Sequence, residues 1–347
     1  MNKNRLILSV VLIVLFAVTL ACGSASPTVQ PATISTATSS SPNSTQAPAN
    51  NAPTAPVNTS TVAPIDTATT APVVVQTYLG DAVQKDGYAI TALSVADPAK
   101  PGMLYSAETG KKLVAVEVNI SNLSGAQISI NPLDTTLVDS DGFSNQADLG
   151  SVDDQIATAD LNPGEQIHGW ISFKISQNAT VTTLKYSPEV LSSEFIQVNL
   201  LPPPTSHVAI TAPITPAVQT SKLGDVIQQN GYSLTADKVE DPSTPGMLYT
   251  ATQGYKLVAV EIILDNVSGA QALSANPLYA FAIDTNGFVY STELGGRDGQ
   301  INSMDLNVGD KVKGWVSFSI PATASLAYIK YQTDMFSGNY LVAGLTK

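Results

Sequence analysis

The strongest constraint on this chain is that its sequence repeats once, over a distance as long as a whole domain. Residues 79–88 read LGDAVQKDGY, and residues 223–232 read LGDVIQQNGY. Later in each copy, residues 168–173 read HGWISF and residues 313–318 read KGWVSF. The offset is 144 positions at the first motif and 145 at the second, which is far longer than a solenoid repeat. We therefore expect two tandem domains that share one fold.

Each copy alternates apolar and polar residues with the period of a β-strand. Residues 113–120 read LVAVEVNI, so three valines and an isoleucine fall on one face, and residues 257–264 repeat the pattern. Asp-Gly, Asn-Gly and Asn-Pro-Gly turn signals separate such runs, and no stretch of ten or more residues has a convincing helical period. We expect an all-β protein with two tandem immunoglobulin-like antiparallel β-sandwiches, each of about seven short strands, after a disordered N-terminal tether.

Changes in composition divide the chain into five parts. Residues 23–72 are mainly Ser, Thr, Pro, Ala and Asn, which bury too little apolar surface to offset the entropy of ordering. The predicted parts are a signal peptide (1–21), a disordered Ser/Thr/Pro-rich tether (22–73), β-sandwich domain 1 (74–200), a Pro-rich linker (201–217) and β-sandwich domain 2 (218–347). The linker repeats the composition of the tether, and its three consecutive prolines predict a semi-rigid spacer.

The amino terminus has the features of an export signal. Lys3 and Arg5 precede the apolar run Leu6–Leu20, which is short for a membrane span. The chain's only cysteine, Cys22, follows an alanine after this run. The junction resembles the lipobox of bacterial lipoproteins, which implies cleavage before Cys22 and diacylation of its sulfur. The lipid would hold the protein on the extracytoplasmic face of the cell membrane, or at the outer membrane if the organism has one. An uncleaved signal anchor is the alternative.

Both copies also resemble a family of bacterial surface domains. The order LGD…GY, KLVAVEV…N, DSDGF and LNPGE…GWISF in the first copy, with its counterparts in the second, is similar to the immunoglobulin-like domains of the DUF4352 family. The resemblance covers most of residues 79–200 and 223–345. It implies a β-sandwich fold and a cell-surface setting, and it implies no particular activity.

Composition and motifs argue against several classes of function. The formal net charge of −12 repels nucleic-acid phosphates, so we expect no nucleic-acid partner. A single cysteine excludes an intramolecular disulfide and a thiolate metal site. The two histidines, His168 and His207, form no Ser-His-Asp set that both copies share, and no phosphate-binding glycine loop is present. We therefore expect no enzymatic activity and no cofactor other than a weak calcium site.

The calcium interpretation rests on acidic residues beside a predicted hairpin. Asp139 and Asp141 lie in the sequence DSDG, and Asp284 is the counterpart of Asp139 in the second copy. Oxygen ligands around a glycine turn are typical of calcium loops. A hairpin that uses Asp and Asn for its left-handed turn explains the same residues without a metal, and it is the favoured interpretation.

Two other groups of residues are candidates for ligand contact. Trp170 and Trp315 fall on the strand face opposite the phenylalanine that enters the core, where each could stack against a sugar or a peptide. Burial under a loop or another domain is the alternative. The second group lies in the repeated PGMLY connection, which either plugs the open end of the sandwich, the favoured interpretation, or presents an adhesive edge. Its residues are Met103, Leu104, Tyr105, Met247, Leu248 and Tyr249.

Three functions remain open at this stage. The favoured one is a lipid-anchored, non-catalytic binding or adhesion module of the cell envelope, with a cell-wall glycan or a protein as partner. The alternative is a structural spacer or envelope assembly factor without a small ligand, in which the two domains pack through their tryptophan faces. A calcium-binding or hydrolytic accessory protein is a third interpretation, and a hydrolase needs a cleft with converging acidic residues.

Overall fold

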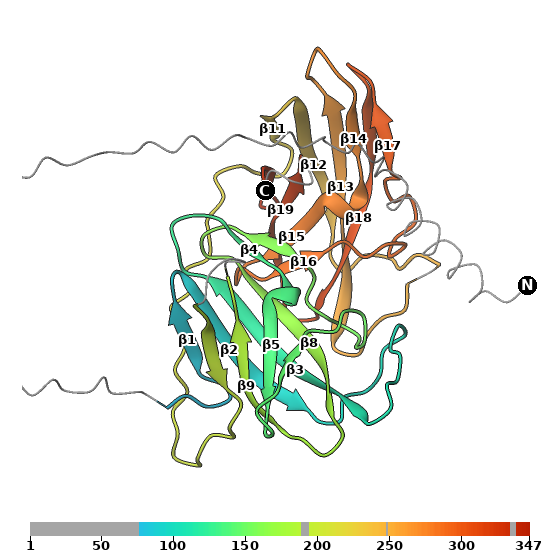
Figure 1. Cartoon of the computed structure of the whole chain (residues 1–347). Coiled ribbons are helices and arrows are strands. Elements are labelled where there is room, and N and C mark those ends of the chain that lie inside the picture. The colour runs from blue at the N-terminus through green and yellow to red at the C-terminus, as the bar shows by residue number, and fades with distance from the viewer. Residues whose placement is uncertain (1–75, 189–193, 248, 334–337) are drawn as a thin grey trace, which may run out of the picture. The chain divides into compact units, whose positions relative to one another are not determined.

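A computed structural model describes residues 76–188, 194–247, 249–333 and 338–347 (Figure 1). The predicted signal peptide, the whole tether with Cys22, and Leu248 lie outside these residues. The chain from Ala71 to Lys347 forms one compact unit that contains both sequence copies. Below, copy one denotes residues 76–200 and copy two denotes residues 218–347.

Copy one is built from antiparallel sheets. Its described residues form the elements β1 (Ala82–Lys85), β2 (Tyr88–Ala96), β3 (Lys111–Asn122), β4 (Ile128–Ile130), η1 (Pro132–Asp134), β5 (Thr135–Asp139), β6 (Ser144–Gln146), β7 (Ala159–Leu161), β8 (Gln166–Ser176), β9 (Val181–Tyr186) and β10 (Ile196–Asn199). The two larger sheets have the orders β1-β2-β3-β8 and β10-β9-β5-β6, and β4 pairs with β7. The all-β sandwich prediction is therefore confirmed.

Copy two repeats these elements in the same order. They are β11 (Val226–Gln229), β12 (Tyr232–Glu240), β13 (Tyr255–Asn266), β14 (Leu273–Ala275), η2 (Pro277–Tyr279), β15 (Ala280–Asp284), β16 (Val289–Ser291), β17 (Met304–Leu306), β18 (Lys311–Pro321), β19 (Leu326–Gln332) and β20 (Tyr340–Gly344). Even the irregularity after Ala92 in β2 recurs after Ala236 in β12. The backbone fold has thus been duplicated down to a single bulge.

The number of strands differs from the sequence prediction. The described part of each copy contains ten strands, whereas about seven were expected. In copy one, β4, β6 and β7 have three residues each, and a run of three is too short to show an alternating pattern. The additional strands are thus those that carry no periodic signal.

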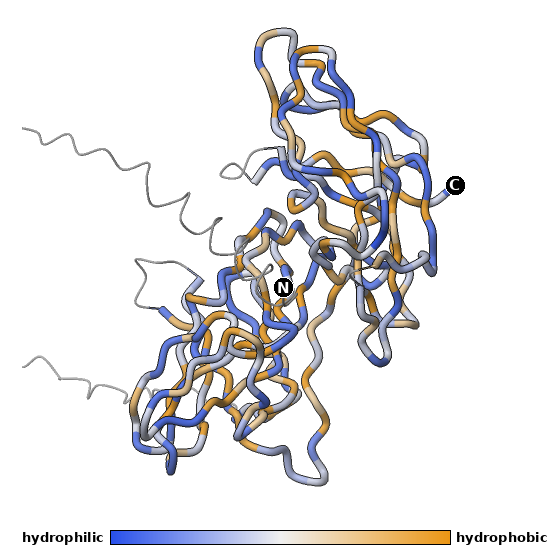
Figure 2. The backbone as a smooth tube through the Cα atoms, turned by 90° about the vertical axis from the view of Figure 1, so that its right-hand side faces the viewer, coloured by the Kyte–Doolittle hydropathy of each residue, from blue (hydrophilic) through white to orange (hydrophobic). Residues whose placement is uncertain are grey.

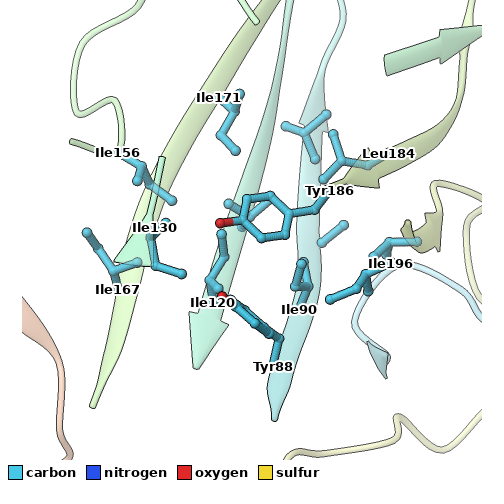
Figure 3. Close-up of a cluster of buried hydrophobic side chains, with 14 of the residues drawn as sticks. Tyr88, Ile90, Ile120, Ile130, Ile156, Ile167, Ile171, Leu184, Tyr186 and Ile196 are labelled. Carbon is cyan, nitrogen blue, oxygen red and sulfur yellow. The ribbon is translucent and has the colours of Figure 1, made fainter. Parts of the chain in front are cut away.

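The two faces of β3 explain how the core forms. Val114, Val116 and Val118 are completely buried between the two sheets, as the alternation predicts. Figure 3 shows Ile120 of β3, Ile171 of β8 and Tyr186 of β9 in this cluster. Along the tube in Figure 2, hydrophobic and hydrophilic residues alternate over short distances in both copies. The core of each copy is therefore built by period-two burial.

A buried asparagine closes the end of the long central strand in each copy. The Asn122 side-chain amide donates to the carbonyls of Ala126 and Leu161, at 2.7 and 2.8 Å. Asn266 donates in the same way to the carbonyls of Gln271 and Leu306. Buried carbonyls need a partner, and each asparagine supplies two donors where the ladder of the strand ends. This explains why the repeated strand motif ends in Asn.

The two copies meet through apolar side chains and a buried ion pair. Phe281, Tyr328 and Tyr340 of copy two belong to the same buried cluster as the core of copy one. Lys330 of β19 and Glu165 of copy one both have fully buried side chains, and their charged groups are 2.5 Å apart. The Lys330 ammonium also donates to the carbonyl of Asp160, and the Tyr328 hydroxyl donates to Glu165 at 2.9 Å. The Tyr340 hydroxyl donates to the Asp160 carboxylate at 3.1 Å. Each of these buried polar groups thus has a partner from the other copy, which is what burial of charge requires.

The linker is docked on copy one. Ile210 is held through both backbone groups: its N–H donates to Asp81 Oδ1 at 2.8 Å, and its carbonyl accepts from the Ala82 N–H at 2.7 Å. His207 Nε2 donates to the same oxygen at 2.7 Å. The predicted spacer therefore covers the outer edge of β1, and Asp81 is fully buried beneath it.

Candidate functional site

A groove of about 640 Å³ lies beside the junction of the two copies, and we call it the Trp170 groove. Copy one contributes Leu93, Glu117, Asp154, Gln155, Ile156, Ala157, Ile167, His168, Gly169 and Trp170. Copy two contributes Tyr255, Phe288, Val289, Tyr290, Ser291, Thr292, Glu293, Ser319 and Pro321. Its volume is that of a typical small-ligand site, and it contains one of the two tryptophans that the sequence singled out.

Strand alternation places Trp170 on the outer side of its sheet. Ile171 and Phe173 of β8 enter the main core, so Trp170 points the other way. There it packs against a small separate cluster that includes Leu113, Ala115 and Tyr105. The backbone of Trp170 is fixed as well, because its N–H donates to the Asp154 carbonyl at 3.0 Å and its carbonyl accepts from Ile156. The half-buried indole is therefore held rigidly at the groove.

The glycine before the tryptophan lets the 154–156 segment cross the strand. A Cβ at Gly169 would lie 2.8 Å from the Asp154 carbonyl oxygen, and its φ is +159°. A side chain at this position would push the segment away from β8. Gly314 has the same role in copy two, where a Cβ would lie 2.9 Å from Ile301. The repeated Gly-Trp motif therefore has a structural cause.

The polar lining of the Trp170 groove is acidic. Glu117 accepts from His168 Nε2 at 3.0 Å and from the Ser94 hydroxyl at 2.7 Å, so both of its oxygens are engaged. Burial raises the pKa of Glu293, and the negative charge of Asp154 raises it further. Burial likewise raises the pKa of Tyr255, to which Asp154 and Glu117 add. Carboxylates from both copies thus act on one another across the groove.

These residue types suit recognition of a polar, ring-shaped ligand. Trp170 and Tyr255 offer aromatic surface, and the carboxylates and His168 supply hydrogen-bond partners around it. The negative charge disfavours phosphates and other anions.

The second tryptophan occupies the same place in copy two but has different surroundings. The Arg297 guanidinium lies 3.7 Å from the centre of the Trp315 ring. Two hydrogen bonds to the Glu240 carboxylate, at 2.9 and 2.7 Å, hold Arg297 in that position. One face of Trp315 is therefore covered, and Trp315 does not line the Trp170 groove.

The PGMLY loops lie over the outer face of their sheets. In each loop the tyrosine contacts the sheet, whereas the methionine is exposed to solvent. Tyr105 packs beside Trp170 in the small cluster, whereas Met103 is 88% exposed. In copy two, the Tyr249 hydroxyl is 3.3 Å from the Ser319 hydroxyl, and Met247 is 92% exposed. The methionines thus do not plug the sandwich as the favoured interpretation required, and the described loop residues do not line the Trp170 groove.

Leu104 lies between these extremes. It is 63% exposed, and its side chain lies against Gly150, where a Cβ would come within 3.0 Å of it. Leu248, its counterpart, lies outside the described residues.

The acidic hairpin residues act as turn caps. Asp139 Oδ1 accepts from the N–H groups of Asp141 and Phe143, and Asp139 Oδ2 accepts from the Asn145 amide. Asp284 Oδ1 accepts likewise from the N–H groups of Asn286 and Phe288, and the Tyr290 hydroxyl donates to Oδ2.

Both aspartates are buried, and Asp141 is exposed. Within the residues that the structure describes, no group of three or more His, Cys, Asp or Glu side chains is placed to hold a metal ion. The carboxylates thus have the hydrogen bonds that a turn requires, and the calcium site stays a prediction.

Sequence reasoning missed most of the groove. Leu93, Tyr255 and Phe288 were not singled out, because the wall from copy two depends on how the copies meet. A signal was present in the repeat: Leu93 aligns with Asp237, and His168 aligns with Lys313. In copy two these charged residues pair with each other at 2.7 Å. Replacement of an Asp–Lys ion pair by Leu93 and His168 marks a difference between the two copies.

Comparison with solved structures finds proteins of low sequence identity to this chain. The candidate lipoprotein ycdA of Bacillus subtilis matches with 10% identity and a TM-score of 0.31, over 35% of this chain and 38% of its own. The yjhA protein of Bacillus subtilis matches with 18% identity and a TM-score of 0.30, over 36% and 99%. The secreted protein MPT63 of Mycobacterium tuberculosis matches with 12% identity and a TM-score of 0.31, over 38% and 98%. The chain thus spans little more than a third of the first of these relatives.

Three further findings concern membrane-spanning helices, curated proteins and the family of the chain. The described residues include no helix with the length and apolar character that crossing a membrane requires. No curated protein matches the chain. The family profile of the domain of unknown function DUF4352 matches residues 77–196 and again residues 221–341, which together make up more than half of the sequence. The chain therefore belongs to the DUF4352 family, and it contains two copies of the domain in tandem.

Proposed function

We propose that this protein is a non-catalytic binding module of the cell envelope that takes a glycan into the Trp170 groove. The observation that carries the proposal is the rigid, half-buried Trp170 at a groove of about 640 Å³ with polar walls. A tryptophan face with hydrogen-bonding groups around it suits a sugar ring, which has apolar C–H faces and a rim of hydroxyls.

The charge of the groove narrows the class of glycan. Asp154, Glu117 and Glu293 are acidic, and the whole chain has a net charge of −12. Anionic polymers, such as those linked through phosphate, are disfavoured on both counts. Neutral and amino sugars, of the kind that build cell-wall strands, fit this field best.

The amino terminus supports the proposed location of the protein in the cell. The lipobox-like junction at Cys22 supports an anchor in the membrane, with the domains on the extracytoplasmic face. Metabolic labelling with an alkyne fatty acid tests this proposal, and we expect label on the wild-type protein and none on Cys22→Ser. Labelled Cys22→Ser protein, or a wild-type protein that keeps its leader and takes up no label, contradicts the anchor.

Glycan binding can be tested with a control that the chain itself offers. Insoluble cell-wall polysaccharide should retain the wild-type protein in a sedimentation assay. Trp170→Ala should weaken this binding about 5- to 150-fold, because loss of one stacked aromatic removes about 1–3 kcal/mol. Trp315→Ala is the matched control, since Trp315 is the equivalent residue and lies outside the groove. Thermal unfolding of both variants shows whether the fold is retained.

The two variants also define what contradicts the proposal. If Trp170→Ala folds and binds as well as Trp315→Ala, the groove is not the glycan site. If the wild-type protein binds no wall polysaccharide, the remaining candidate is a structural spacer, which the buried Glu165–Lys330 junction favours. A spacer predicts that disruption of this junction changes the reach of the pair and that Trp170→Ala has no phenotype.

A further inference from the structure

We propose that the outer edge of β11 in copy two is a docking site for an extended peptide segment of a partner protein. The site consists of Asp225 and Val226, it is separate from the Trp170 groove, and it does not depend on glycan binding. Copy one shows how such an edge is occupied, because its own linker is seated on the equivalent residues.

The occupied edge has a simple hydrogen-bond pattern. On copy one, Ile210 bonds with its N–H to Asp81 Oδ1 and with its carbonyl to the Ala82 N–H. His207, three residues earlier, donates to the same aspartate oxygen. The Asp81 carboxylate and the adjacent Ala82 N–H thus bind one backbone residue and one side-chain donor of the linker. The linker adds one backbone hydrogen bond to the edge of β1, which is the elementary contact by which an extended segment docks on a sheet edge.

Copy two keeps the backbone geometry and the carboxylate of this receptor. The position of Tyr78, whose ring centre lies 4.8 Å from that of His207 on copy one, is occupied by Lys222. Gly224 has the same φ as Gly80, +93°, and each donates to the next strand at 2.8 Å. Asp225 Oδ2 accepts from the Lys222 N–H at 2.8 Å, as Asp81 Oδ2 accepts from Tyr78. The second carboxylate oxygen of Asp225 therefore has the position that receives Ile210 on copy one.

The backbone donor is retained as well. Val226 pairs with Thr235 in the register that Ala82 has with Thr91, so the Val226 N–H faces outward as the Ala82 N–H does. In the described part of the chain, no residue takes the place on copy two that Ile210 holds on copy one. The exposed fraction of the residue shows the consequence: it is 59% for Val226 and 5% for Ala82.

An uncovered edge with an apolar residue is unusual in a soluble sheet, because such edges invite pairing with another chain. The chemistry of the occupant follows from the linker. It is an extended, uncharged segment with a β-branched residue whose N–H and carbonyl both face the edge. It carries a hydrogen-bond donor side chain three residues earlier, as His207 precedes Ile210.

The test tethers a peptide with these features to the chain, so that its effective concentration at the β11 edge is high. The sequence of residues 203–213 is appended to the full chain after Lys347 through a flexible spacer, which removes weak affinity as a reason for failure. Amide hydrogen exchange then reports on the edge. We expect at least tenfold slower exchange of the Val226 N–H and of the appended isoleucine N–H than in the chain without the addition.

Two variants show whether the predicted contacts carry the docking. Val226→Pro removes only the outward N–H, and it should return the appended isoleucine to fast exchange while thermal unfolding changes little. Asp225→Asn should reduce the protection several-fold, because a neutral amide is a weaker acceptor than a carboxylate. Replacement of the appended isoleucine by proline is the matched control in the ligand.

Three outcomes overturn the proposal. The first is unchanged exchange at Val226 in the fusion protein. The second is protection of the appended segment that survives Val226→Pro. The third is protection of Val226 in the chain without the addition, together with dimerisation in sedimentation equilibrium, which makes a second copy of this chain the occupant.

Discussion

Copy one and copy two share a backbone and differ in what their surfaces do. Both have the same strand order, the same bulge and the same buried asparagine. On the outer face of the first sheet, copy one carries Leu93 and His168 beside Trp170. Copy two carries Asp237 and Lys313 as an ion pair and places Arg297 on Trp315. Duplication thus preserved the residues that determine the fold, and the surfaces diverged toward different contacts.

The junction provides the largest test of this difference. Lys330 is buried against Glu165, whereas its counterpart Lys185 lies half-buried near the Phe195 ring. Lys330→Met should lower the free energy of unfolding by about 3–5 kcal/mol, because Glu165 would stay buried without its cationic partner. Lys185→Met should change it by less than about 0.5 kcal/mol. Denaturant unfolding measures both.

A double variant separates loss of charge pairing from loss of packing. Adding Glu165→Gln to Lys330→Met removes the unpaired charge, so part of the lost stability should return. Equal losses for Lys330→Met and Lys185→Met contradict the view that the junction is particular to copy two.

Loss of the buried asparagine should lower the free energy of unfolding equally in the two copies. Asn122→Ala and Asn266→Ala each leave two carbonyls without their side-chain donors. We expect each variant to lose about 2 kcal/mol of unfolding free energy. Chemical denaturation followed by circular dichroism measures the change. A large loss in one copy and none in the other refutes the structural role that we assign to this residue.

Exchange of one residue between the copies should expose Trp315. Val152 of copy one is the counterpart of Arg297, and it packs in the cluster beside Trp170. Arg297→Val should cost about 1 kcal/mol and increase the quenching of Trp315 fluorescence by acrylamide. A Trp170→Phe background leaves Trp315 as the sole tryptophan. Unchanged quenching shows that Arg297 does not shield the ring.

The smallest expected effect is an acid-dependent release of the linker. Burial raises the pKa of Asp81, but hydrogen bonds from the Ile210 N–H, His207 and the Tyr78 N–H outweigh it and hold that pKa below its ordinary value of 3.8. The stabilisation that this carboxylate gives to the docked linker is fully present at pH values above its ordinary pKa. That stabilisation is lost as the pH falls through the lowered pKa of the docked state.

We therefore expect Ala82 amide protection to persist through mild acid and to fall only below about pH 4. Amide exchange across a pH series measures it, with Asp81→Asn as the control that lacks the titrating group. Loss of protection already near pH 6 contradicts the role of Asp81.

Much of the fold follows from sequence, because it depends on local alternation that one strand displays by itself. The interpretation of β3 as a strand buried on one face and partly on the other is confirmed: its valines enter the main core, and Leu113 and Ala115 pack in the small outer cluster. The placement of Trp170 opposite Phe173 follows from the same period.

The site was less accessible to such reasoning, because it depends on residues that meet only after folding. Tyr328 and Lys330 correspond to Thr183 and Lys185 of copy one. No periodic pattern in the sequence shows that Tyr328 and Lys330 contact Glu165. The linker resembled a free spacer by composition, and a single buried carboxylate, Asp81, holds it in place. Contacts made by one or two polar groups leave no trace in hydropathy.

The Glu165–Lys330 pair has a consequence for the environment in which the groove works. Because neither charge contacts water, dissolved ions have little access to it, unlike the exposed pairs of copy two. The walls of the groove belong to both copies, so its width should stay the same in brine and in fresh water. The buried pair should therefore keep the groove in one shape over a wide range of salt concentrations.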